Sequence, residues 1–245
     1  MRLTERIHVV GGSEPGFGRS DPLDAQVYVL ETSDGLAVID SGAGRELPTV
    51  LAEVRASGLD THAIRWLLLT HGHADHAGGA AAWRRELPRV SVLASDPVSG
   101  WLTAGDEEAT SVDRARVAGI YPPDYRLEPC DVEPLPAGRV AMGDVDVDVL
   151  PTPGHAAGHV AFAATVDGAL TVFSGDALFP DGRILLQDTW DCDLHAALRS
   201  VEALAVLEPE RLLAGHGAPV LAGARDHVQR ALDRIARLLP PEQLE

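Results

Sequence analysis

The chain of 245 residues contains no lysine, so all 20 of its basic residues are arginines. A catalytic mechanism that needs a lysine amine, such as Schiff-base formation, is therefore excluded. The 37 acidic residues bring the net charge to −17 at pH 7. An acidic surface repels phosphate backbones and anionic lipids, so we expect no nucleic acid and no membrane as partners.

Cysteine is scarce, and long apolar runs are missing. Cys130 and Cys192 are the only cysteines and form no C-x-x-C pair. This usage offers no disulfide framework and is typical of a reducing compartment. The N-terminal stretch MRLTERIHVVGG has no apolar segment of the signal-peptide kind, and no run approaches the roughly 18 residues that span a bilayer. We expect a cytoplasmic protein.

Apolar periodicity predicts one α/β domain over residues 1–245. The expected strands are 7–12, 26–32, 35–42, 64–70, 89–94, 145–149, 159–166, 169–176 and 211–217. The expected helices are 45–58, 80–87, 194–207 and 223–239. Between residues 95 and 130 the strand pattern stops, and the segment is charged and partly helical. An insertion of this length predicts a lid or a binding loop.

Seven side chains of the metal-ligand type follow the ends of four expected strands. They are His71, His73, Asp75, His76, His155, Asp176 and His216. Because strand ends meet at the edge of a sheet, we expect these side chains to converge. Imidazole and carboxylate donors suit Zn²⁺, and also iron or manganese. Seven donors exceed the needs of one tetrahedral ion, so they predict two divalent metal ions that share a ligand.

The same residues stand in four motifs in a fixed order. These are His71-x-His73-x-Asp75-His76, PGH at 153–155, SGDALF at 174–179 and AGHG at 214–217. The series resembles the motifs of the metallo-β-lactamase-fold hydrolase superfamily and runs from about residue 7 to residue 220. The resemblance implies a four-layer αββα sandwich, in which two mixed β-sheets pack face to face with helices on both outer faces.

The resemblance also implies a role for each ligand-type residue. His71, His73 and His155 would hold the first ion, Asp75, His76 and His216 the second, and Asp176 would bridge the two. Asp75 and Asp176 are then the expected catalytic carboxylates, with Asp176 accepting or relaying a proton. Asp40, in VIDSG, matches an aspartate that orients the metal-binding side chains in this family.

Hydrolysis of a small ester, thioester or lactone is the implied reaction, with a metal-bridging hydroxide as the nucleophile. Zinc β-lactamases of the superfamily lack the bridging aspartate, so Asp176 disfavours β-lactam hydrolysis. Glyoxalase II has the same motifs but carries a helical domain after the last histidine, where one helix is expected here. Lactonases share PGHAAGH, in which His159 acts either as a donor behind the metal ligands or as a structural residue.

A mononuclear iron persulfide dioxygenase stays open as the alternative. Such enzymes hold one iron and carry a stretch with cysteine and arginine after the GD motif, where this chain has Arg183 and Cys192 in a different arrangement. Arg183 either meets a substrate carboxylate at the pocket mouth or is a solvated loop residue. The proline-rich neighbourhood of Tyr121 predicts exposure. His8 matches no motif and is expected as a surface or capping residue. We expect a small-molecule substrate, and a homodimer is an open alternative to a monomer.

Overall fold

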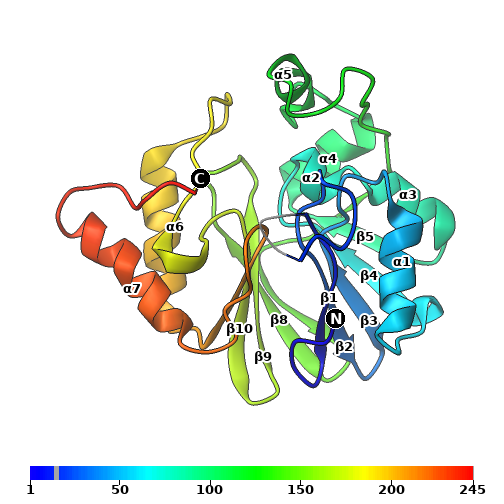
Figure 1. The fold of residues 1–245 in the computed structure, drawn as a ribbon, viewed down its shortest axis with the longest axis horizontal. Helices are drawn as coiled ribbons and strands as arrows, with labels where there is room; N and C mark the ends of the chain where they lie inside the picture. The colour runs from blue at the N-terminus through cyan, green and yellow to red at the C-terminus, as the bar shows by residue number, and fades with distance from the viewer. Residues whose placement is uncertain (14–16, 245) are drawn as a thin grey trace.

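The computed structural model describes residues 1–13 and 17–244. Two β-sheets pack face to face, and helices cover the outer face of each sheet (Figure 1). This arrangement confirms the expected four-layer αββα sandwich. Among the described residues, no helix combines the length and the apolar character needed to cross a membrane.

The first sheet has the strand order β1-β2-β3-β4-β5-β6. Its strands are β1 (Ile7–Gly11), β2 (Val27–Thr32), β3 (Gly35–Ile39), β4 (Ile64–Leu68), β5 (Ser91–Ala94) and β6 (Glu133–Pro134). The first three strands pair antiparallel, and the pairs from β3 to β6 are parallel. The sequence does not predict β6, because two residues are too few to show an alternating pattern.

The second sheet has the order β11-β10-β9-β8-β7. Its strands are β7 (Gly138–Met142), β8 (Val145–Pro151), β9 (Val160–Val166), β10 (Ala169–Gly175) and β11 (Arg211–Ala214). Only β10 and β11 pair in parallel. The valines of β8 are buried while Asp146 is exposed, as the alternating sequence predicts. Both sheets are therefore mixed.

Three apolar clusters hold the four layers together. One lies between the sheets and joins residues such as Ile39 to Phe162. A second packs α1 (Leu47–Ala56), α3 (Ala80–Glu86) and α4 (Asp96–Ala104) on the first sheet. A third packs α6 (Leu194–Val206) and α7 (Ala224–Ile235) on the second sheet. The remaining helices are short: η1 (Thr61–Ala63), α2 (Ala74–Ala77), α5 (Val112–Val117) and η2 (Pro180–Gly182).

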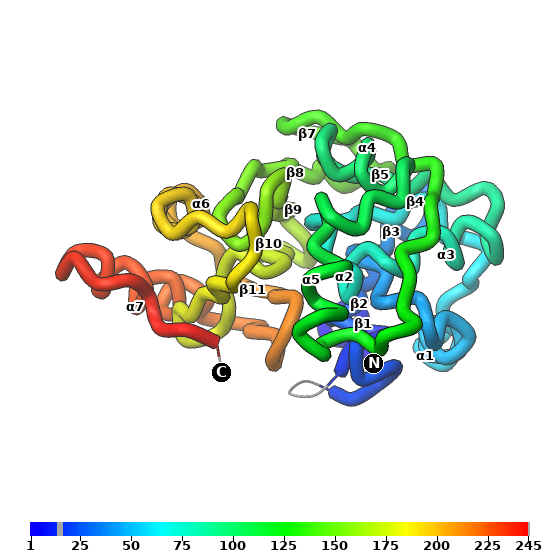
Figure 2. Tube along the Cα trace, turned by 90° about the horizontal axis from the view of Figure 1, so that it is seen from above, coloured from blue at the N-terminus to red at the C-terminus, as the bar shows by residue number. Residues whose placement is uncertain are grey.

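The segment between residues 95 and 130 carries α4 and α5 and stands at one edge of the sandwich (Figure 1). Seen from above, α5 lies between the α6–α7 side and the α1–α3 side of the molecule (Figure 2). Tyr121, expected to be exposed, has a relative exposure of only 7%. The prediction was wrong because Tyr121 turns its side chain inward and donates a hydrogen bond to Asp75, while Pro123 and Asp124 next to it are exposed.

Candidate metal centre

The structure brings all seven predicted ligand residues together at the sheet edge beneath α5. His71 and His73 follow β4, Asp75 and His76 lie in α2, His155 follows β8, Asp176 follows β10, and His216 follows β11. Gly215 permits this close approach, because a Cβ atom there would lie 2.2 Å from Asp176 Oδ1 and 2.4 Å from His76 Cε1. A larger residue at position 215 would push the cluster apart.

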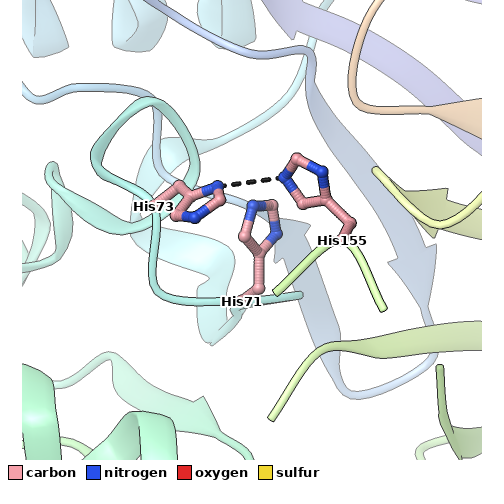
Figure 3. Close-up of side chains that lie close together, drawn as sticks. All are labelled: His71, His73 and His155. Atoms are coloured by element: carbon pink, nitrogen blue, oxygen red, sulfur yellow. Dashed lines mark hydrogen bonds between the residues drawn. The ribbon is translucent and has the colours of Figure 1, made fainter. Parts of the chain in front are cut away.

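Three buried histidines form one side of the cluster. The donor atoms of His71, His73 and His155 lie within 4.8 Å of one another. Their rings face a common point, and His73 Nδ1 lies 3.0 Å from His155 Nε2 (Figure 3). This group matches the donor set expected for the first ion.

Asp75, His76 and His216 form the other side, and their donor atoms also lie within 4.8 Å of one another. His216 Nε2 lies 3.2 Å from Asp75 Oδ2. Asp176 stands between the two groups, since Oδ2 lies 3.6 Å from His155 Nε2 and 3.5 Å from His216 Nε2. Its carboxylate is thus placed where the sequence predicts a shared ligand.

Protein groups occupy the ring nitrogens that point away from the cluster. His155 Nδ1 lies 2.9 Å from the carbonyl oxygen of Leu185, and His76 Nδ1 lies 2.8 Å from Asp40 Oδ2. His71 Nδ1 lies 3.0 Å from Thr70 Oγ1, which donates to Asp40 at 3.0 Å. Each of these acceptors favours the tautomer in which Nδ1 carries the proton, so that the lone pair of Nε2 can bind a metal ion. Asp40 therefore orients two ligand histidines, as expected.

His159 does not join the ligand groups. Its Nδ1 lies 2.8 Å from Thr152 Oγ1, and its Nε2 accepts the backbone N–H of Asp176 at 3.0 Å. Both ring nitrogens are therefore engaged, and the ring holds the backbone of the shared carboxylate in place. Of the two roles considered for His159, these contacts match the structural one, because the partners of its ring are a threonine hydroxyl and a backbone N–H.

Burial and mutual charge set the protonation of the cluster. Burial, with help from neighbouring imidazoles, lowers the pKa of His71 well below its ordinary value, and burial lowers the pKa of His73 to about 4. Burial opposes ionisation of Asp176, yet His76 and His216 hold the pKa of this carboxyl well below its usual range. Burial opposes the charge on His76 and His216, but the neighbouring carboxylates raise the pKa of both, that of His76 well above its ordinary value. Metal binding at these two imidazoles therefore releases protons, while His71 and His73 are already neutral.

The donor atoms fit divalent cations. Four of them are buried and have no hydrogen-bond partner: His71 Nε2, His73 Nε2, His76 Nε2 and Asp176 Oδ1. A buried polar atom without a partner costs about 1–3 kcal/mol. Cations held by the two donor groups would give such atoms partners, and the set of imidazoles and carboxylates is the one that Zn²⁺ accepts.

Tyr121, a possible wall residue of the substrate site, makes a contact with Asp75 that the sequence does not predict. Its hydroxyl donates to Asp75 Oδ1 at 2.9 Å and accepts the Asp75 backbone N–H at 3.2 Å. Burial and the Asp75 charge raise the pKa of Tyr121 well above its ordinary value, so the phenol stays protonated and can donate. A contact across 46 residues depends on how the insertion folds, and no local motif announces it.

One of the two alternatives for Arg183 and the expectation for His8 need correction. Arg183 borders a separate cavity beside α7 with Arg230 and Arg234, not the cavity at the cluster, because η2 carries it toward α7. His8 is buried rather than at the surface, and its Nε2 lies 2.8 Å from Glu31 Oε1. Its place in β1, with Glu31 on the neighbouring strand, explains the burial.

A cavity of about 610 Å³ opens beside the cluster. His73, Asp75 and His216 form part of its lining, together with residues of the insertion and of the segment 187–189. A small molecule in this cavity would touch both donor groups.

The chain is similar in sequence and in fold to known proteins. The sequence profile of the metallo-beta-lactamase superfamily matches residues 20–216. A hydroxyacylglutathione hydrolase of Cereibacter sphaeroides is 34% identical over 138 residues, which cover 56% of this chain and 43% of that protein. The uncharacterized protein YobT of Bacillus subtilis is 25% identical over 220 residues, which cover 86% of this chain and 90% of that protein. The chain spans about half the length of hydroxyacylglutathione hydrolases that it matches, 43% of the one from Cereibacter sphaeroides and 48% of one from Xanthomonas euvesicatoria.

Among solved structures, BJP-1, a subclass B3 metallo-beta-lactamase of Bradyrhizobium japonicum, aligns with a TM-score of 0.73. The alignment covers 97% of this chain and 91% of that chain at 21% identity. A likeness at this identity shows the shared fold alone. With the profile match across most of the chain, it confirms the family that the four motifs resemble: this chain belongs to the metallo-beta-lactamase superfamily.

Proposed function

We propose that this protein is a hydrolase that uses two divalent metal ions, Zn²⁺ in the first place, to cleave a small ester, thioester or lactone. One observation carries the proposal. Seven donor residues form three overlapping groups, the donor atoms of each group lie within 4.8 Å of one another, and four buried nitrogen and oxygen atoms of these residues have no hydrogen-bond partner. Superfamily membership and the similarity to hydroxyacylglutathione hydrolases support hydrolysis as the reaction.

His71, His73 and His155 would hold one ion, and Asp75, His76 and His216 would hold the other, with Asp176 shared between them. When bound, such ions polarise a carbonyl group and make water nucleophilic near neutral pH. The chain's own task is to fix the donors. Asp40 contacts His76 directly and His71 through the Thr70 hydroxyl. The Leu185 carbonyl oxygen contacts His155. These contacts hold the three imidazoles in the tautomer that presents Nε2 to the metal.

Asp75 and Asp176 are the proposed catalytic carboxylates. Asp75 faces the cavity, and Tyr121 donates to its Oδ1, which leaves Oδ2 directed toward His216. Asp176 lies deeper, between the two donor groups. An ionised carboxylate in that position can take the proton released when water adds to the substrate carbonyl and pass it to the departing oxygen or sulfur.

The alternative, a persulfide dioxygenase with one iron, needs one donor group only. The second group, Asp75, His76 and His216, favours the dinuclear hydrolase. Asp176 at the shared position likewise favours ester, thioester or lactone substrates over β-lactams. The proposal also includes a single domain over residues 1–245, with the segment 95–130 as its lid.

Partners and location follow from the same reasoning. With a net charge of −17, we propose a small-molecule substrate and neither nucleic acid nor membrane as a partner. A cytoplasmic location agrees with the low use of cysteine. Sedimentation of the purified protein decides between a monomer and a homodimer.

The experiment is an assay of metal-free and zinc-reconstituted protein on a panel of thioesters, lactones, a phosphodiester and a β-lactam, with oxygen uptake on a persulfide as a further arm. We expect zinc-dependent hydrolysis of thioesters, esters or lactones, with more than a hundredfold loss in His71→Ala. His195→Ala is the control, since this histidine is exposed on α6. Oxygen uptake with one iron per chain, or fastest turnover of the phosphodiester or the β-lactam, would contradict the proposal.

A further inference from the structure

The cavity beside the metal centre has two apolar walls. One wall comes from the insertion and includes Ala115, Ala118 and Ile120. The other comes from the segment before β2 and includes Pro22 and Leu23. These side chains offer carbon atoms and no hydrogen-bonding groups. They are suited to a hydrocarbon chain, whose removal from water stabilises the complex.

The cavity offers no free cation among its described lining residues. Arg114 is the only arginine there, and its guanidinium is paired with the side-chain carboxylate and the backbone carbonyl of Asp188. The other charged residues of the lining, apart from the histidines, are Asp75 and Asp188. Beyond the residues that would bind metal, a substrate anion would meet Asp188 and an arginine that is already engaged, so this outer part of the lining disfavours negative charge.

Two contacts join the insertion to the segment before α6 beside the cavity. The Arg114–Asp188 pair joins α5 to the segment before α6, and Trp190 Nε1 donates to the carbonyl oxygen of Ala109 at 3.3 Å. Trp101 of α4 and Trp190 also meet edge to face, with centroids 6.0 Å apart. The apolar wall of the insertion is therefore held over the metal centre and would cover an acyl chain lying between them.

We propose that the substrate is an uncharged acyl compound whose apolar chain lies against Ala115, Ala118 and Ile120, with its carbonyl at His73, Asp75 and His216. This inference rests on the proposed function and specifies its substrate class. It distinguishes the protein's substrate from an anionic glutathione thioester. A cavity of about 610 Å³ has room for a chain of several carbons beside the reacting group.

Thioesters of the uncharged thiol N-acetylcysteamine with acetyl, butyryl and octanoyl groups test the chain preference on the zinc-loaded protein. We expect kcat/KM to rise at least tenfold from acetyl to octanoyl, and the octanoyl compound to be turned over faster than S-lactoylglutathione. A flat profile, or faster turnover of the glutathione thioester, would overturn the inference.

Methyl ketones of the same chain lengths cannot be hydrolysed. Their binding, measured by calorimetry, therefore tests the preference for an apolar chain separately from the proposed hydrolase function. We expect binding to tighten with chain length and to show a negative heat-capacity change. Tightening without hydrolysis of any thioester, ester or lactone would sink the proposed function and leave this inference standing. If binding does not depend on chain length, the inference fails whatever the hydrolysis shows.

Ala118→Glu places a charge in the apolar wall at a position that is exposed and sterically open to a longer side chain. We expect the ratio of octanoyl to acetyl turnover to fall at least tenfold while zinc content stays the same. Val206→Glu is the matched control, because Val206 is 82% exposed on α6 and lies outside the cavity. Equal octanoyl-to-acetyl ratios in the two variants would overturn the inference.

Discussion

Asp40 has a φ of 62°, a left-handed backbone that aspartate tolerates better than most residues. This conformation follows β3 directly and turns the carboxylate toward the metal centre. Oδ1 accepts the Thr70 backbone N–H at 2.8 Å, and Oδ2 meets His76 Nδ1 at 2.8 Å. A strained residue thus connects the end of β3 with two histidines of the centre.

Asp40→Asn is the cleanest change at this residue, because asparagine also tolerates the left-handed backbone. It removes the negative charge that orients His71 and His76. We expect zinc affinity, measured by competition with a chromophoric chelator, to fall about 10–100-fold. Asp34→Asn, in the exposed turn between β2 and β3, should keep the wild-type affinity. Equal affinities of the two variants would refute the role of Asp40.

Tyr121→Phe removes only the hydroxyl that donates to Asp75. We expect one zinc ion per chain to bind at least fivefold more weakly, because Asp75 loses the contact that directs Oδ2 toward His216. Tyr125→Phe is the matched control, since its hydroxyl donates to the Ala43 carbonyl oxygen at 2.9 Å, away from the donor atoms. Both variants should lose about 1 kcal/mol of stability. Equal zinc binding in both would show that the Tyr121 contact is structural only.

At the scale of elements, the ends of the strands carry the ligands, and α6 secures one of these ends. The backbone N–H of Asp193 donates to the Gly154 carbonyl oxygen at 2.8 Å, and Ser200 Oγ donates to the Pro153 carbonyl oxygen at 2.6 Å. The start of α6 therefore sits on the turn that presents His155. Packing of α6 on the second sheet and the position of one metal ligand depend on the same contacts.

Gly154→Ala tests this coupling. Gly154 has a φ of +134°, and a Cβ atom there would lie 2.2 Å from the backbone nitrogen of Ala197 in α6. We expect a loss of at least about 2 kcal/mol in the free energy of unfolding, with weaker zinc binding. Gly168→Ala is the control: φ is +73°, but nothing lies within 4 Å of the added carbon. It should cost only the backbone strain and keep zinc affinity, and similar losses in both variants would contradict the clash with α6.

Periodicity and strand ends made most elements and all seven donor residues predictable. The alternation in β8 and the apolar run of β4 depend on local sequence, and the motifs sit directly after such strands. The contact from Tyr121 to Asp75 and the turn of Arg183 toward α7 depend on how two loops pack. Loop packing depends on distant residues, which explains why the sequence does not predict the Tyr121 contact and does not decide between the two alternatives for Arg183.

At the scale of the whole molecule, the metal centre joins the two halves of the sandwich. Ligands after β4 belong to the first sheet, and ligands after β8, β10 and β11 belong to the second. Bound ions would therefore tie both sheets at one edge. Ligand binding to the folded state alone stabilises it, by about 2.7 kcal/mol at a free concentration of 100 Kd.

Removal of metal should therefore lower the melting temperature of the whole protein. We expect a chelator to lower Tm by about 5–10 °C, and added zinc to restore it. His71→Ala should respond less than the wild type in the same calorimetric scan, since one ion loses a ligand. Identical Tm values with and without chelator would show that no ion contributes to the folded state.

The central claim is that the seven donor residues hold two metal ions at the sheet edge. Anomalous diffraction from zinc-loaded crystals, recorded on both sides of the zinc absorption edge, tests it most directly. The account predicts two peaks per chain, one among His71, His73 and His155 and the other among Asp75, His76 and His216, with Asp176 in contact with both. A single peak, or peaks away from these residues, would contradict it.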